Sequence, residues 1–127
     1  MKKRIIIISC IILAILLGLF LLTGTARTDV YLKDFNIDPN SSTMTLKIGV
    51  ASSAGYVRDL KIKQGGDNKY ITFYSTFGIN SKLGAADTFE ISLNNSCTEI
   101  YFYTGGKGYT KVLEKDENGI WTKVTNK

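Results

Sequence analysis

The stretch Met44-Thr45-Leu46-Lys47-Ile48-Gly49-Val50 alternates large apolar residues with small or polar ones at a period of two. Successive side chains of a β-strand point to opposite faces, whereas a helix with one buried face repeats its apolar residues every three to four positions. The stretch is therefore predicted to be a strand with one buried face. It sets a pattern that other segments of the chain repeat.

Seven further segments on either side show the same alternation or a similar β-rich composition. They cover residues 30–37, 60–63, 70–74, 89–93, 99–103, 111–115 and 120–124. Turn residues separate them, including the hairpin signals Gly65-Gly66-Asp67-Asn68 and Asn118-Gly119. Residues 80–87 are long for a turn and are expected to hold one helical turn or a crossover. The pattern predicts an all-β domain of about seven or eight strands, a single antiparallel β-sandwich or small barrel.

The N-terminal segment has a different pattern. Lys2, Lys3 and Arg4 precede an apolar run over residues 5–22. As a helix this run would cover roughly 27 Å, close to the roughly 30 Å hydrocarbon core of a bilayer. Basic flanks stay in the cytoplasm. We therefore expect residues 1–4 to be cytoplasmic, 5–22 to be a single-pass transmembrane signal anchor, and 28–127 to form an extracytoplasmic β domain.

Cleavage is the alternative to anchoring. A signal peptide has a shorter apolar region, of about 7–15 residues, followed by a small-x-small site. Gly24-Thr25-Ala26 would serve as that site, and cleavage after Ala26 would make the protein secreted. The length of the apolar run favours the anchor. The membrane is thus the first expected partner, reached through the N-terminal helix.

The charge of the chain gives little support to nucleic-acid binding. The formal net charge is +5, and three of the 16 basic residues lie in the N-terminal segment, which leaves +2 for the exported part. Nucleic-acid binding calls for a basic stripe on the folded domain. Lys61 and Lys63 near aromatic residues are a faint indication only, so no nucleic-acid partner is expected.

The chain contains no histidine. This excludes Ser-His-Asp and Cys-His catalysis and histidine-based zinc sites. Cys97 is the single cysteine outside the apolar run, so the domain has no internal disulfide, and the thiol is expected to be a small buried apolar group. We expect no cofactor and no metal.

Two motifs that resemble ligand sites have simpler interpretations. Asp34-x-Asn36-x-Asp38 copies the first ligands of a calcium loop, but Pro39 and Thr45 stand where that loop needs glycine and glutamate. The motif is explained more simply as the solvent-exposed polar face of a strand. Gly105-Gly106-Lys107-Gly108 lacks the Ser or Thr and the helix of a phosphate loop, so it is predicted to be a turn between strands.

Paired carboxylates could run glycoside hydrolysis. The candidates are Asp59, Asp87, Glu90 and Glu99, and no rule of sequence brings two of them together.

The tyrosines are the strongest binding candidates. Tyr70, Tyr74, Tyr101 and Tyr103 fall opposite the expected core faces of their strands, and Tyr109 follows the glycine-rich turn. If the strands are neighbours, these rings form a platform suited to a protein or a sugar ring. The alternative is that cross-strand tyrosine pairs only stabilise the sheet. Trp121, the single tryptophan, is expected to anchor the core.

Three short motifs carry a resemblance. They are Ala51-Ser52-Ser53-Ala54-Gly55-Tyr56, Phe73-Tyr74-Ser75-Thr76, and Glu99-Ile100-Tyr101-Phe102-Tyr103 before the glycine-rich turn. The exported part resembles a group of small uncharacterised membrane-anchored proteins of Gram-positive bacteria. The resemblance implies the location and no activity.

The leading functional hypothesis is a non-enzymatic binding or interaction module on the outer face of the cytoplasmic membrane. Its ligand would be a protein or a cell-wall glycan, since loops and faces on a rigid β scaffold commonly carry recognition. Two alternatives stay open, a carboxylate- or tyrosine-based cell-envelope enzyme and a structural accessory subunit of a membrane complex.

Overall fold

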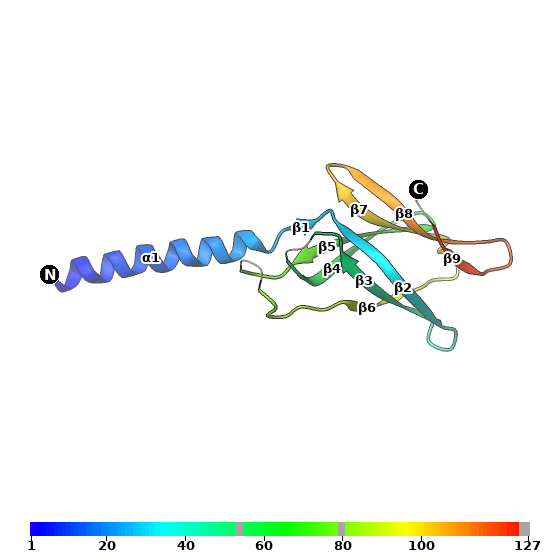
Figure 1. The fold of residues 1–127 in the computed structure, drawn as a ribbon, viewed down its shortest axis with the longest axis horizontal. Coiled ribbons are helices and arrows are strands. Elements are labelled where there is room, and N and C mark those ends of the chain that lie inside the picture. Colours follow the sequence, from blue (N-terminus) through cyan, green and yellow to red (C-terminus); the bar gives the residue numbers. More distant parts are fainter. Residues whose placement is uncertain (53–54, 79–80, 125–127) are drawn as a thin grey trace.

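The computed structural model describes residues 1–52, 55–78 and 81–124, and the side chains of residues 20–23 lie outside that description. In this part of the chain one helix precedes nine strands that form two sheets (Figure 1). The elements are α1 (Lys2–Thr23), β1 (Ala26–Arg27), β2 (Val30–Asp38), β3 (Thr43–Val50), β4 (Val57–Gly65), β5 (Asn68–Ser75), β6 (Thr88–Ser92), β7 (Glu99–Gly105), β8 (Gly108–Lys115) and β9 (Trp121–Lys123).

The two sheets differ in size. The larger sheet has six strands in the order β1-β5-β7-β8-β9, with β4 paired to β5, and the smaller sheet has the order β2-β3-β6. Most neighbours are antiparallel, but β5 and β7 are parallel, with Tyr70 opposite Tyr101 and Ile71 opposite Phe102. Neither sheet closes on itself.

One apolar core lies between the sheets. The Phe73 ring, from the larger sheet, lies 5.8 Å from that of Phe89 in the smaller sheet and 4.8 Å from that of Phe102. The residues of the opening stretch behave as predicted, since Met44 and Leu46 are fully buried and Lys47 between Leu46 and Ile48 is exposed. The buried apolar side chains come from both sheets: Val30, Leu32, Met44, Leu46, Ile48, Val57, Ile71, Phe73, Ile91, Cys97, Ile100, Phe102 and Leu113.

The all-β domain after one N-terminal helix is confirmed, together with its hairpins. Gly66 and Asp67 form the turn between β4 and β5, and residues 116–120, with Asn118 and Gly119, connect β8 to β9. The segment Gly105-Gly106-Lys107-Gly108 is the β7–β8 turn, as expected, with Gly105 at φ 117° and Gly106 at φ 58°.

Three expectations about the fold need correction. The sheets are open, so the small barrel is wrong, and the parallel β5–β7 pair breaks a wholly antiparallel order. The described residues hold nine strands rather than seven or eight, because the two-residue strand β1 is too short to show any alternation. The pairing of β5 with β7 is parallel because the chain leaves β5, runs through β6 in the other sheet, and returns to the larger sheet in β7.

The connection from β5 to β6 is a crossover. Its described residues 81–87 contain a turn at Leu83 and Gly84 and no helical turn. Asn80, where the expected helical turn would begin, lies outside the described residues, as do residues 53–54 of the 51–56 motif.

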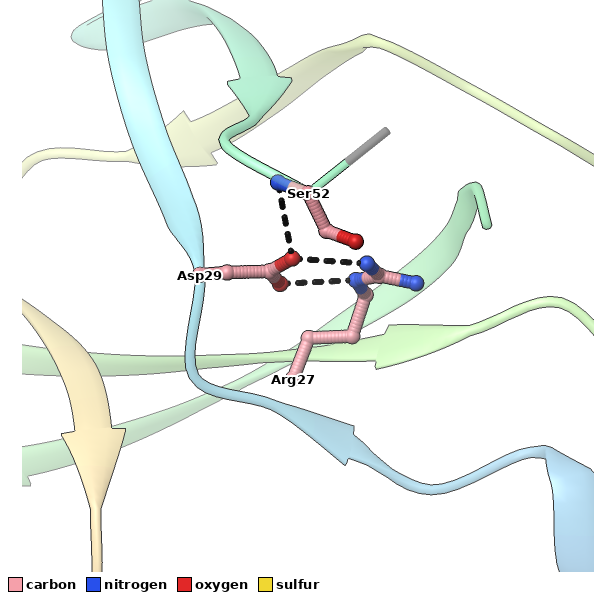
Figure 2. A network of polar contacts seen from close by, with 3 residues as sticks. All are labelled: Arg27, Asp29 and Ser52. Atoms are coloured by element: carbon pink, nitrogen blue, oxygen red, sulfur yellow. Dashed lines mark hydrogen bonds and ion pairs between the residues drawn. The ribbon is translucent and has the colours of Figure 1, made fainter. Parts of the chain in front are cut away.

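Strand β1 and the residues after it link the two sheets. Arg27 belongs to β1 of the larger sheet, and Asp29 precedes β2 of the smaller sheet. The guanidinium of Arg27 donates to both carboxylate oxygens of Asp29, at 2.9 and 2.8 Å, and the Ser52 amide donates to the same carboxylate at 3.3 Å (Figure 2). The Arg27 side chain beside Asp29 lowers the pKa of that carboxyl. This half-buried ion pair thus holds the chain in place where it passes from β1 of the larger sheet to β2 of the smaller sheet.

Helix α1 projects away from the β domain, with its N-terminus at the far end of the molecule (Figure 1). Its large apolar side chains from Ile5 to Leu19 are exposed to between 53% and 68%. The predicted apolar run 5–22 ends at positions whose side chains lie outside the description. Within the described residues, no helix meets the length and apolarity that crossing a bilayer requires.

Candidate functional site

Four of the five predicted binding residues meet on one surface of the larger sheet. Tyr70 lies in β5, Tyr101 and Tyr103 in β7, and Tyr109 in β8. Ile71 beside Tyr70 and Phe102 between Tyr101 and Tyr103 are buried in the core, so alternation turns these tyrosines to the opposite face. The ring contacts of Tyr109 place it with them. We call Tyr70, Tyr101, Tyr103 and Tyr109 the tyrosine face.

The rings of the tyrosine face form a continuous series of contacts. Tyr70 stacks on Tyr101 with ring centroids 5.0 Å apart and meets the edge of Tyr109 at 5.1 Å. Tyr109 in turn contacts Tyr103 edge-on at 5.5 Å. Each tyrosine is half-buried, so rings are packed against one another while part of each stays open to solvent. The arrangement is an aromatic surface carried on three adjacent strands.

Two hydroxyl groups of the face have fixed partners. The Tyr101 hydroxyl donates to Oε2 of Glu99 at 2.6 Å, and the Tyr103 hydroxyl donates to the carbonyl of Gly106 at 3.0 Å. The bond to Glu99 raises the pKa of Tyr101, since the phenol is favoured as the donor. The same bond, with Lys111 as a further cause, lowers the pKa of Glu99. Tyr101 is therefore held as a neutral phenol beside a carboxylate.

A charged group borders the rings. Lys111 of β8 lies directly across from Tyr101 and places Nζ 3.4 Å from Glu99 and 3.1 Å from Glu114. The two carboxylates raise the pKa of Lys111, with Glu114 contributing most. These groups are partly exposed, so the pairs orient the side chains more than they stabilise the fold. Lys111 was not singled out from the sequence; the Glu99-x-Tyr101 spacing on one strand face is the signal that points to this cluster.

Tyr74, the fifth predicted residue, lies outside the series of ring contacts described above. Tyr74 is half-buried in β5, and Lys61 Nζ lies over its ring, 5.4 Å from the ring centroid. Its neighbours across the sheet are Ala26 of β1 and Asp59 of β4. Strand β1 takes the place beside Tyr74 that β7 holds beside Tyr70, so no tyrosine of β7 lies opposite it.

The four candidate carboxylates lie on separate elements. Asp59 is in β4, Asp87 in the loop before β6, Glu90 in β6 and Glu99 in β7. A cleft of about 570 Å³ lies where β2, β3 and the crossover meet, and Asp87 is the one candidate carboxylate that lines it. The described residues hold no group of three or more cysteine or acidic side chains placed to bind a metal.

The remaining candidates have structural surroundings. Asp34 and Asp38 are exposed in β2, and each accepts a hydrogen bond from a nearby backbone amide. Cys97 is fully buried, as predicted, and burial raises the pKa of its thiol. Trp121 packs against the core, with Lys115 Nζ 5.8 Å from its ring centroid.

Comparison with known proteins finds no significant relative of this chain. No protein-family model matches the chain, and neither the curated proteins nor the solved structures contain a significant match.

Proposed function

We propose that this protein is a non-enzymatic binding module held at the outer surface of the cytoplasmic membrane by α1, and that the tyrosine face is its recognition surface. The observation that carries the proposal is the packing of Tyr70, Tyr101, Tyr103 and Tyr109 into one half-exposed aromatic series on β5, β7 and β8. Tyrosine combines a rigid ring with a polar tip, and aromatic residues are the commonest anchors of binding surfaces.

The chemistry of the face favours binding over catalysis. The hydrogen bond to Glu99 raises the pKa of Tyr101, which makes tyrosinate chemistry at neutral pH less favourable. Glu99 is itself engaged by Tyr101 and Lys111, and Lys111 also contacts Glu114, the residue across from Glu99 on β8. A half-exposed surface of packed rings, with the hydroxyls of Tyr101 and Tyr103 held by fixed partners, fits a sugar ring or an extended protein segment. We name these two ligand classes, a cell-wall glycan and a partner protein.

Helix α1 supports the membrane location. Its apolar side chains are exposed on the described turns, and Lys2, Lys3 and Arg4 precede them. Exposed apolar surface of this extent is costly in water, and basic residues at one end set the orientation of membrane helices. The cleaved, secreted form is the alternative outcome for the same segment.

Tyr101→Ala and Tyr70→Ala in the full-length protein test the recognition surface. Each should weaken retention on purified cell-wall glycan or on a partner from solubilised membranes by roughly tenfold, or about 1–2 kcal/mol. Tyr31→Ala is the matched control, because Tyr31 is 46% exposed in β2 of the smaller sheet. Retention is measured by sedimentation with the glycan and by pull-down.

A purely structural role for the rings gives a different result. Each stacked pair stabilises a sheet by about 0.5–1.5 kcal/mol, so both variants will also unfold at a somewhat lower temperature. Binding is therefore compared well below the unfolding transition. Unchanged retention by Tyr70→Ala and Tyr101→Ala, with only a lowered melting temperature, would contradict the proposal.

A further inference from the structure

The turn between β5 and β6 presents an apolar side chain to solvent. Leu83 is 78% exposed, the highest value for a large apolar residue among the described residues after α1. It lies at the tip of a turn closed by the Ala85 amide, which donates to the Lys82 carbonyl at 3.0 Å, and Gly84 supplies a φ of 76°. Such tips normally carry polar residues or proline. Leu83 is therefore an apolar side chain held mostly in water.

The turn is held firmly on both sides. The buried hydroxyl of Thr76 donates to the Ser81 carbonyl at 2.5 Å, and the Ser81 hydroxyl accepts from the Leu83 amide at 3.2 Å. On the other side the Ala86 amide donates to the Val57 carbonyl at 2.8 Å. These bonds tie the position of Leu83 to the larger sheet.

This turn lies on the end of the domain from which α1 projects (Figure 1). A methyl group placed on Gly24 would collide with the ring of Phe77, which shows that this ring packs closely against the Gly24 backbone. Gly24 directly follows the last residue of α1. The segment that begins the crossover therefore touches the end of the helix.

The connection from α1 to the sheet leaves almost no free chain. Only Gly24 and Thr25 separate α1 from β1, and two extended residues span at most about 7 Å. The headgroup layer of a bilayer is about 5–8 Å thick on each side of the hydrocarbon core. If α1 lies in the bilayer, this end of the domain lies at headgroup depth.

The side chains around the turn suit that depth. Arg58 places its guanidinium carbon 4.2 Å from the ring centroid of Phe77, and Lys82 Nζ lies 5.6 Å from that of Tyr56. Aromatic rings gather at the membrane–water interface, and long basic side chains reach anionic headgroups while their stems lie along apolar surface. The end of the domain thus pairs two cations and two rings beside one exposed leucine.

We propose that the turn Lys82–Ala85 is a second membrane contact, in which Leu83 enters the outer leaflet around α1 while Arg58 and Lys82 meet lipid phosphates. The inference rests on the membrane location proposed above and commits to the lipid leaflet as the occupant. Two contacts, the helix and the turn, then fix the rotation of the domain about the axis of α1.

The test uses the full-length chain in vesicles of phosphatidylcholine and phosphatidylglycerol, with and without brominated acyl chains. Tryptophan is placed at the turn by Leu83→Trp in a Trp121→Phe parent, which removes the single native tryptophan. Ile120→Trp in the same parent is the matched control, because Ile120 is 57% exposed in the β8–β9 connection, away from α1 (Figure 1). Flotation of each variant with the vesicles measures anchoring separately.

We expect every variant to float, Leu83→Trp to show blue-shifted emission that is lost with brominated lipid, and Ile120→Trp to keep its emission. Flotation with solvent-like, unquenched emission from Leu83→Trp would overturn the turn contact and leave the anchor standing. Quenching of both variants would overturn the fixed orientation. Failure to float would overturn the anchor, and the turn contact with it.

Discussion

Asp29 is the residue on which the join between the two sheets depends. Its carboxylate accepts two bonds from Arg27 and one from the Ser52 amide, and it is only partly open to solvent. Asp29→Asn keeps the shape but removes the charge. We expect a loss of about 1–2 kcal/mol in the free energy of unfolding at pH 7. Urea unfolding measures it.

The same carboxylate predicts a pH dependence. Arg27 lowers the pKa of Asp29 below its ordinary value of 3.8, so the native state holds the charged form more strongly than the unfolded state does. The stabilisation is complete above pH 3.8 and disappears as the pH falls through the lowered pKa. The difference between wild type and Asp29→Asn should therefore vanish in acid. Asp34→Asn, at an exposed position of β2, is the control and should match wild type at pH 7.

Single residues were predictable where one strand decides their surroundings. The side of the sheet on which Tyr70 and Tyr101 lie follows from alternation alone, and so does the burial of Leu46. The separation of Tyr74 from the tyrosine face was not predictable, because it depends on β1 occupying the adjacent sheet edge. The partnership of Tyr101 with Glu99 and Lys111 depends likewise on the β7–β8 register.

At the scale of elements, the β7–β8 turn depends on glycine conformation. Gly105 has a φ of 117°, outside the left-handed helical region, whereas Gly66 in the β4–β5 turn has a φ of 60°. Asparagine tolerates the second conformation but not the first. Gly105→Asn should lower the free energy of unfolding by about 1–3 kcal/mol and Gly66→Asn by much less.

Thermal unfolding of the two variants checks this comparison. Because Tyr103 and Tyr109 flank the β7–β8 turn, Gly105→Asn should also disturb the tyrosine face, which near-ultraviolet circular dichroism reports. Equal stability of the two variants would show that the turn does not constrain the strands.

Hairpins were predictable at this scale because their turn residues are local signals, as at Asn118-Gly119. The parallel pairing of β5 with β7 was not, because periodicity specifies which face is buried and carries no information on which strand is the neighbour. The two-residue strand β1 gave no local signal at all.

For the whole molecule, the question is where the stable domain begins. A chain starting at Gly24 keeps β1, and one starting at Thr28, the boundary expected from the sequence, loses it. Loss of β1 removes the Thr25–Ser75 backbone bond and the Arg27–Asp29 pair. We expect the shorter chain to be less stable by about 2–4 kcal/mol. Urea unfolding of both chains measures this.

A third chain separates the contribution of the Arg27–Asp29 ion pair from that of the β1 backbone. Arg27→Gln in the chain from Gly24 removes the ion pair and keeps the backbone of β1. It should fall between the other two in stability. Equal stability of the chains from Gly24 and from Thr28 would mean that β1 adds nothing to the sheet.

The contact of Thr25 with Ser75 joins positions 50 residues apart in the chain. At a synthesis rate of about 5–20 residues per second, the partner of β1 follows it by roughly 3–10 seconds. Pairings between distant segments also form slowly, because a long loop must close first. After the helix has been made, β1 of the nascent chain thus remains unpaired until β5 has been synthesised. A chaperone or a lipid surface has that interval in which to act on it.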